Sequence, residues 1–289
     1  SNQKAFDLMK SGLVPPATGD PLHNPEYDMI DAQLTTEIFG LYAPGRPDVA
    51  VRMSSLPIQT TARAESEWIS KFYVHLFSLA STADSALPIK EKLFQMAEQA
   101  KSELPPASYP AAMYRYVKGL YASGIPWEQA RDSVYQRYQV EQSDGYDISS
   151  RKLFCNGCFA AGINFAASLV SLFYGEGDLK ETIKIGALAG WDSDNPTATW
   201  GGLIGLMLGW ILFGGNNTSG GCPYPIYDAD DHAYDVKVDK DGFIYVTGFF
   251  SGFDADFDGF TITNPDWNVD CQPMGYIGKL DSSGNWLWV

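Results

Sequence analysis

The chain is organised around one stretch, residues 190–205, which reads GWDSDNPTATWGGLIG. Its first part places two carboxylates, Asp192 and Asp194, one residue apart in a turn that begins with glycine. Asn195 is expected to cap a helix whose first position is Pro196, because a side-chain oxygen and a fixed φ both suit a helix start. A small, apolar run follows and predicts a tightly packed helix. Asp192 and Asp194 are therefore expected to be held in fixed positions at the start of this helix.

Two carboxylates at this spacing are expected to share one space, where they repel each other. Either a bound cation or a raised pKa relieves such repulsion, and a hard divalent ion suits carboxylate oxygens. A second interpretation is structural, because the helix dipole favours negative charge at a helix N-terminus. Spacing alone leaves both interpretations open.

Other blocks of sequence accompany this motif in a fixed order. They are residues 12–16, 30–40, 43–47 and 174–178, with Asn164 before the last. Together with the Asp-x-Asp stretch they resemble a bacterial branch of the ADP-ribosylglycohydrolase family, over roughly residues 5 to 214. No single block is as specific as their combination.

The resemblance implies a mainly α-helical domain and a metal-dependent hydrolase that cleaves a glycosidic bond of ADP-ribose, attached to a protein or a small molecule. Asp192 and Asp194 fall on the two aspartates of the family's last metal-binding motif, and Asn195 falls where many members have threonine. The resemblance therefore implies Mg²⁺ as cofactor, with Asp192, Asp194 and Asn195 as its ligands. The expected catalytic residues are Asp192 and Asp194 together with Asp31.

Three residues are expected to contact the ADP-ribose-containing ligand: Asp31, Asn164 and Trp191. Asp31 belongs to the block Ile-Asp-Ala-Gln, which recurs near the ligand in the family. Asn164 has an alternative, a buried amide that satisfies backbone groups. Glu37, later in the same block as Asp31, is expected to be structural.

One departure from the family pattern motivates a second hypothesis. Family members usually begin with a segment that carries a Gly-Asp and then a Thr/Glu-Asp-Asp-Thr metal motif, and the first thirty residues here do not supply that metal motif. Either the chain is a fragment of a longer protein, or the family's chemistry has been abandoned in it. In the second case it would be a non-catalytic extracellular binding or assembly module on a degenerate hydrolase fold.

Composition excludes several classes of partner. The 289 residues include 20 basic and 35 acidic side chains, for a formal net charge of −15. This balance argues against sequence-independent nucleic-acid binding, which needs a basic face, and disfavours anionic membrane surfaces in the same way. The longest apolar run, residues 203–213, is shorter than the ~20 residues that a membrane span needs. No signal peptide is visible at the start.

Apolar residues at helical spacing predict amphipathic helices joined by short Pro- and Gly-containing connections, which together indicate an antiparallel helical assembly. In the first, residues 28–42, the apolar face is expected to contain Ile30, Leu34, Ile38 and Leu41, whereas residues 1–27 are expected to be loop. The other predicted helices cover residues 65–80, 89–104, 109–122, 126–138, 154–173 and a segment ending near residue 189.

A change of pattern marks a second region. Residues 214–221 have the composition of a flexible linker between a helical domain, 1–213, and a β segment, 222–289. Alternation and turn chemistry predict hairpins of 233–239 with 243–248 and of 274–281 with 286–289.

These strands resemble about one blade of a short β-propeller repeat found in large bacterial surface and secreted proteins. A single blade leaves strand edges open, so a partner chain is expected to complete it. The same resemblance favours a secreted or cell-surface location over the cytoplasm.

Two further groups of residues suggest metals or cross-links. Asp254, Asp256 and Asp258 match the first half of an EF-hand loop, but Pro265 replaces its final glutamate, so a looser surface Ca²⁺ site is expected instead.

Cysteines offer a second possibility. Cys155 and Cys158 form a Cys-Asn-Gly-Cys turn, with Cys222 and Cys271 far downstream. Four cysteines permit two disulfides, and a zinc site is the alternative, although the chain has only three histidines to complete it.

Overall fold

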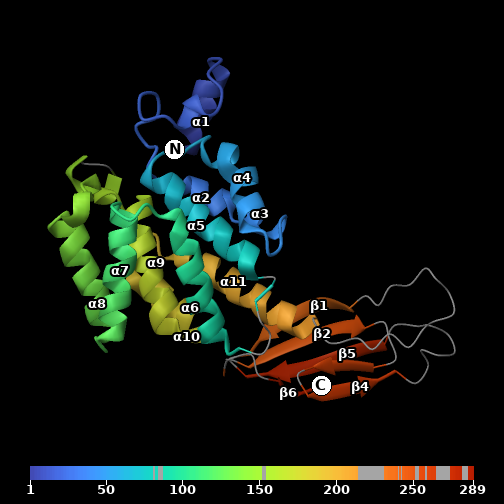
Figure 1. Ribbon diagram of the computed structural model, residues 1–289. Helices are drawn as coiled ribbons and strands as arrows, with labels where there is room; N and C mark the ends of the chain where they lie inside the picture. Colours follow the sequence, from blue (N-terminus) through green and yellow to red (C-terminus); the bar gives the residue numbers. More distant parts are fainter. Residues whose placement is uncertain are drawn as a thin grey trace. The chain divides into compact units, whose positions relative to one another are not determined.

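The computed structural model describes residues 1–80, 82–83, 87–151, 154–213, 231–239, 241, 243–250, 254–257, 259–264, 274–281 and 286–289. They divide into two compact units, Ser1–Ile204 and Gly205–Val289. Figure 1 shows that the first unit is helical and that the second contains strands. The predicted fold class, mainly α with a small C-terminal antiparallel sheet, is confirmed. The predicted linker, 214–221, lies outside the described residues.

The helices are α1 (Asn2–Lys10), α2 (Asp31–Thr36), α3 (Ile38–Leu41), α4 (Pro47–Ile58), α5 (Glu65–Ala80), α6 (Ile89–Ala100), α7 (Tyr109–Ala122), α8 (Trp127–Val134), α9 (Ala161–Gly175), α10 (Leu179–Ala189) and α11 (Asp194–Phe213). A π-helical segment, Tyr135–Val140, continues α8. Most of the helices follow one another through short connections, whereas about twenty residues separate α1 from α2 and Val140 from α9. Two of the helix starts have side-chain caps, in which Ser108 and Asp178 accept the backbone N–H groups of Ala111 and Glu181.

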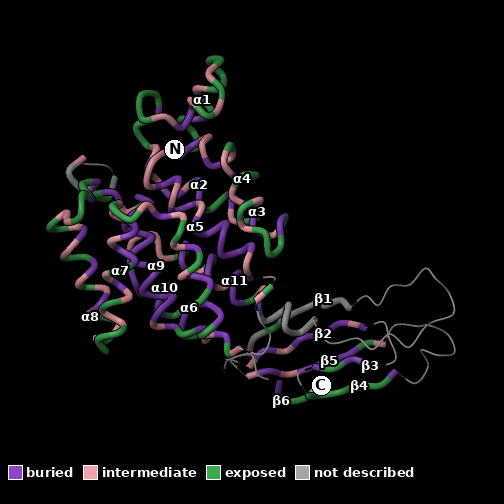
Figure 2. The backbone as a smooth tube through the Cα atoms, in the orientation of Figure 1, coloured by how far each residue is buried: buried purple, intermediate pink, exposed green. Residues whose placement is uncertain are grey.

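Helix α9 lies at the centre of the helical unit, where it contacts α5, α7, α8 and α10. It is buried along nearly its whole length, as Figure 2 shows. A methyl group on Gly175 would come within 2.6 Å of the Cα of Thr182, so glycine permits the close approach of α9 to α10. Glycine at position 175 therefore allows α9 and α10 to pack tightly.

An aromatic cluster joins α5, α9 and α11. The rings of Phe72, Tyr73, Phe165 and Trp200 are buried and lie 5.1–6.0 Å apart in edge-on or tilted pairs. Trp200 Nε1 donates to the carbonyl of Ser168 at 2.9 Å, and the Tyr73 hydroxyl donates to Ser168 Oγ at 2.8 Å. These contacts fix α11, and with it the turn that precedes it, against the centre of the fold.

The N-terminal third differs from its prediction in two ways. Residues 2–10 form a helix in a region expected to be loop, and the helix expected over 28–42 is divided between α2 and α3. Leu34 and Ile38, expected to be buried, are 46% and 45% exposed. The buried face instead carries Ala32, Gln33 and Thr36, because Gln33 finds polar partners inside the fold.

The start of α11 also differs. The helix begins at Asp194, one residue before the expected cap. Asn195 therefore lies in the first turn, and its side chain hydrogen bonds with Gln33 rather than acting as the helix cap.

The second unit contains a four-stranded antiparallel sheet in the order β1-β2-β5-β6 and a separate β3-β4 hairpin. The two predicted hairpins correspond to β1-β2 and β5-β6, while β3-β4 occupies the region of the Ca²⁺ motif. The strands are β1 (Asp231–Val238), β2 (Ile244–Phe250), β3 (Asp254–Phe257), β4 (Phe260–Thr263), β5 (Met274–Leu280) and β6 (Trp286–Trp288).

This sheet does not by itself establish a propeller repeat. A partner chain along its outer strands, and a secreted location, stay predictions. Within the described part of the chain, none of the helices has both the length and the apolar character needed to cross a bilayer.

Candidate active site

A cavity of about 380 Å³ opens in the helical unit beside the Asp-x-Asp turn. Its wall includes Glu26 and Asp31 from the start of the chain, Gly157 and Phe159 from the loop before α9, and Asp192. Two of the predicted site residues, Asp31 and Asp192, therefore meet at one cavity. Its size is within the range of small-molecule sites.

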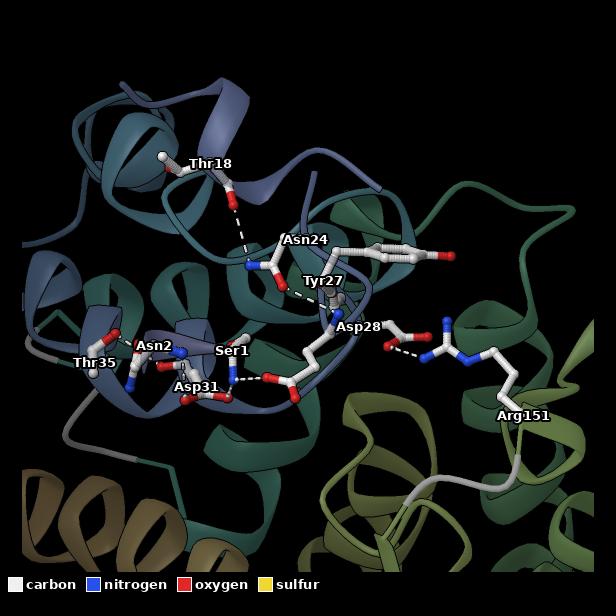
Figure 3. Close-up of polar contacts among 11 residues, drawn as sticks. Ser1, Asn2, Thr18, Asn24, Tyr27, Asp28, Asp31, Thr35 and Arg151 are labelled. Atoms are coloured by element: carbon white, nitrogen blue, oxygen red, sulfur yellow. Dashed lines mark hydrogen bonds and ion pairs between the residues drawn. The ribbon is translucent and has the colours of Figure 1, made fainter. Parts of the chain in front are cut away.

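Asp31 opens α2 and directs its carboxylate toward the beginning of the chain, as Figure 3 shows. Asp31 Oδ1 accepts the backbone N–H of Asn2 at 3.3 Å, and Oδ2 lies 3.5 Å from the amino group of Ser1. The same amino group lies 2.8 Å from Glu26 Oε2. This corner of the cavity therefore contains two carboxylates, those of Glu26 and Asp31.

The Asp-x-Asp turn brings two carboxylates together at the N-terminus of α11. Burial raises the pKa of Asp192 to about 6, and the adjacent Asp194 carboxylate contributes to the shift. Asp192 is partly buried, whereas Asp194 is exposed. The raised pKa of Asp192 agrees with the repulsion expected between the Asp192 and Asp194 carboxylates, and a cation between them would relieve that repulsion.

Asn164 fixes the backbone of this turn from the first turn of α9. Its Nδ2 donates to the carbonyls of Cys158 at 2.7 Å and Ala160 at 2.9 Å, and its Oδ1 accepts the backbone N–H of Asp192 at 3.1 Å. The residue is only 2% exposed. Of the two alternatives for Asn164, the structure shows the buried amide that satisfies backbone groups. Asn164 is not among the residues that line the cavity.

A buried polar network holds α2 and α3 to α11. Gln33 Nε2 donates to Asn195 Oδ1 at 3.0 Å, and Asn195 Nδ2 donates to Gln33 Oε1 at 2.9 Å, so the two amides form a reciprocal pair. Gln33 Nε2 and Thr199 Oγ1 also lie 2.6 and 2.7 Å from Glu37 Oε1. Because Asn195 follows Asp194 directly, this network supports the turn that carries both carboxylates.

Replacing Gln33 by leucine (Q33L) is expected to lower the free energy of unfolding by about 1–3 kcal/mol, because Asn195 and Glu37 lose buried hydrogen bonds. Urea denaturation measures the change. The matched variant Q3L, at an exposed position of α1, is expected to stay within about 0.5 kcal/mol of the parent protein. Equal midpoints for Q33L and Q3L would show that the network contributes no stability.

Glu37 makes stability depend on pH. Its carboxylate is held by neutral partners, and burial raises its pKa from 4.5 to about 7. Because the folded-state pKa is the higher one, its contribution to stability is fully present below about pH 4.5 and is lost as the pH rises through 7. The Gln replacement (E37Q) has a similar shape and no charge.

Between these pH values the parent protein is therefore expected to lose up to about 3 kcal/mol more stability than E37Q. Urea denaturation of both proteins across the range measures the difference. The exposed-site variant E128Q is expected to follow the parent curve. A parent curve that matches that of E37Q would contradict the role given to burial of Glu37.

Trp191, the third residue expected to contact the ligand, lies at a different hollow. Together with Arg131, Tyr135 and Gly190 it lines a shallow cavity of about 320 Å³. Its φ of 53° is in the left-handed region, so the turn into Asp192 has an unusual backbone. A ligand contact for Trp191 stays a prediction.

A family model named ADP-ribosylglycohydrolase matches residues 1–211, which is most of the chain. The chain belongs to the ADP-ribosylglycohydrolase family. Comparison with curated proteins gives no significant match, and comparison with solved structures gives none either. Membership agrees with the sequence resemblance and makes glycosidic hydrolysis the chemistry by which this family is named.

The donor set can be tested against the Mg²⁺ that the family resemblance implies. Among the described residues, no group of three or more His, Cys, Asp or Glu side chains is arranged to hold a metal ion. Mg²⁺ commonly uses one or two carboxylates and completes its shell with water and substrate oxygens. Asp192 and Asp194 fit that requirement as a pair. Both ends of the Asn195 amide are bonded to Gln33, and its ligand role stays a prediction.

The predicted Ca²⁺ site is only partly described. Asp254 and Asp256 lie on β3, whereas Asp258 is outside the described residues. Asp256 Oδ1 accepts the backbone N–H of Gly259 at 2.8 Å, a contact that stabilises the hairpin turn. Ca²⁺ at this position stays a prediction.

Sequence reasoning missed the residues that support the site. Gln33 belongs to the same sequence block as Asp31, but its partner Asn195 is 162 positions away. No local sequence pattern predicts that these two residues pair. The Cys-Asn-Gly-Cys turn was recognised in the sequence, but its position in the cavity wall was not predicted. The only local features that could have indicated it were a glycine and an aromatic residue beside the cysteine pair.

Proposed function

We propose that the helical unit hydrolyses a glycosidic bond at the anomeric carbon of an ADP-ribosyl group, releasing it from a protein or small molecule. The observation that carries the proposal is the meeting of Asp31 and Asp192 at one cavity, in a chain of this family. Acidic groups facing one cavity provide both proton transfer and cation binding.

Asp192 and Asp194 would hold the Mg²⁺. When bound, the ion supplies Lewis-acid chemistry that lowers the pKa of a water molecule and orients ribose hydroxyls. Asn164 and the Gln33–Asn195 pair hold the turn in place, so that the carboxylates do not have to be ordered when substrate arrives. Phe159, 42% exposed at the cavity wall, offers an apolar face to the ligand.

We assign Asp31 as the proton acceptor. It lines the cavity with Asp192 but does not belong to the Asp192–Asp194 pair. The water oxygen forms the new bond to the anomeric carbon while the bond to the departing acceptor atom breaks. Asp31 takes a proton from the water and can return it to the leaving group, so the step balances.

The variant D31N tests this assignment, because it keeps the size of the side chain and removes the base. We expect kcat for release of ADP-ribose from an ADP-ribosylated peptide to fall by about 10²–10⁴-fold, with KM little changed. E26Q, which neutralises the neighbouring carboxylate of the same cavity, serves as the matched control and should retain most of the activity. Equal kcat for D31N and the parent enzyme would exclude Asp31 as the base.

A further inference from the structure

The loop before α9 is closed by a disulfide between Cys155 and Cys158. Inside this ring Cys155, Asn156 and Gly157 have φ values of 45°, 53° and 81°. Residues other than glycine rarely adopt such values, so two consecutive residues of the loop hold an unfavourable backbone conformation. The covalent ring restrains this conformation, and opening it would allow the loop to relax.

This loop is a wall of the candidate active site. Gly157 and Phe159 line the cavity with Asp31 and Asp192. The backbone carbonyl of Phe159 accepts the N–H of Ile30 at 3.1 Å. Just beyond, Ala160 pairs with Met29 in an antiparallel bridge, and Ala161 N–H donates to the carbonyl of Asp28 at 2.8 Å. The position of the loop is therefore coupled to the segment that leads into Asp31.

A second connection runs from the disulfide to Asp192. The carbonyl of Cys158 itself accepts Asn164 Nδ2 at 2.7 Å, and the other end of the same amide accepts the N–H of Asp192 at 3.1 Å. A single buried side chain thus joins the disulfide ring to the backbone of the metal-binding turn. Any shift of Cys158 changes the restraint on Asn164.

The disulfide is accessible to a reductant, because Cys155 is exposed and Cys158 is partly exposed. We propose that Cys155–Cys158 is a reversible redox-modification site, whose reduction loosens the turn at Asp192 through Asn164. The effect on catalysis rests on the function proposed above, whereas the structural coupling does not. The molecule that reacts at this site is a dithiol reductant.

The exchange reaction balances. A thiolate of the dithiol attacks one sulfur of the Cys155–Cys158 bond, which breaks and leaves a mixed disulfide and one cysteine thiolate. The second thiol of the reductant then displaces the other cysteine and forms a cyclic disulfide. Two electrons and two protons pass from the dithiol to the cysteine pair.

Hydrogen exchange measured by mass spectrometry tests the coupling directly. The experiment uses the full chain with C222S and C271S, so that Cys155 and Cys158 are the only cysteines left. Dithiothreitol is expected to accelerate amide exchange in a peptide covering residues 190–194 by about threefold or more, and oxidised dithiothreitol to reverse it. Unchanged exchange after complete reduction, verified by alkylation, would overturn the proposal.

Two variants identify the route. C155S/C158S is expected to exchange as fast as the reduced protein and to be insensitive to dithiothreitol. In N164A the connection is absent, so residues 190–194 should exchange fast in both redox states. An acceleration by dithiothreitol that is as large in N164A as in the parent would overturn the role of Asn164, and circular dichroism checks that each variant is folded.

An activity arm separates this proposal from the proposed function. Reduction is expected to lower ADP-ribosyl hydrolysis by about tenfold or more, because small displacements of catalytic groups are costly. Accelerated exchange in a protein that hydrolyses no ADP-ribosyl bond in either state would support the redox site and count against the proposed function. Activity that persists with unchanged exchange would overturn the redox site alone.

Discussion

Replacing Asp192 by alanine (D192A) is expected to reduce magnesium-dependent ADP-ribosyl hydrolysis by at least about 10²–10⁴-fold. The reason is the loss of one of two carboxylates proposed to hold the ion, whose contribution to the transition state amounts to several kcal/mol. Initial rates at saturating Mg²⁺ measure the effect. S193A, in the same turn, leaves both carboxylates in place and is expected to retain activity.

D192A is also expected to leave the stability of the protein intact. The contact that holds this turn to Asn164 uses the backbone N–H of residue 192, which alanine keeps. The change also removes a partly buried carboxylate with a raised pKa. In a chelator the melting temperature of D192A should therefore equal or exceed that of the parent. Activity lost together with the fold would indicate a structural role for Asp192 and contradict the assignment as a ligand.

Replacing Trp200 by alanine (W200A) is expected to cause the largest loss of stability, about 3–5 kcal/mol. The indole is completely buried between α5 and α9, and its Nε1 satisfies the carbonyl of Ser168. The change leaves a large cavity and removes the buried hydrogen bond that the indole N–H donates to the carbonyl of Ser168. Because a domain of this size has a stability of about 5–15 kcal/mol, the denaturation midpoint should fall sharply.

Urea denaturation followed by the helical circular dichroism signal measures this loss. Y42A removes an aromatic ring that is 63% exposed, and is expected to cost less than about 1 kcal/mol. A midpoint for W200A as high as that for Y42A would show that the aromatic cluster does not hold α11.

Much of the helical fold was predictable because its helices have local signals. The predicted ranges 65–80 and 109–122 coincide with α5 and α7. Both have apolar residues at helical spacing, and Ser108 caps α7. Where periodicity and end signals agree, the boundaries follow from the sequence.

The α2 and α3 region shows why other parts were not predictable. Leu34 and Ile38 form an apolar stripe that periodicity assigns to the core, yet both are nearly half exposed. Gln33 faces inward instead, because its amide is matched by that of Asn195, which lies 162 positions later in the sequence. A polar residue becomes buried when its partner is present, and the partner cannot be inferred from local sequence.

The acidic residues of the candidate site could be predicted from the sequence, whereas the residues that hold them in place could not. The motif resemblance selected Asp31 and Asp192, and the structure brings both to one cavity. The contribution of Asn164 to the backbone of Asp192 depends on a single side chain-to-backbone hydrogen bond. Such a contact leaves no periodicity or spacing in the sequence.

Calorimetric titration of ADP-ribose tests the central claim most directly, because it measures whether the cavity beside Asp31 and Asp192 binds this ligand with the help of Mg²⁺. The parent protein and D192A are titrated with Mg²⁺ present and then with a chelator. We predict saturable binding to the parent protein in Mg²⁺, and at least about tenfold weaker binding in the chelator or in D192A. Absence of binding to the parent protein under both conditions, or equal affinity in all of them, would contradict the account.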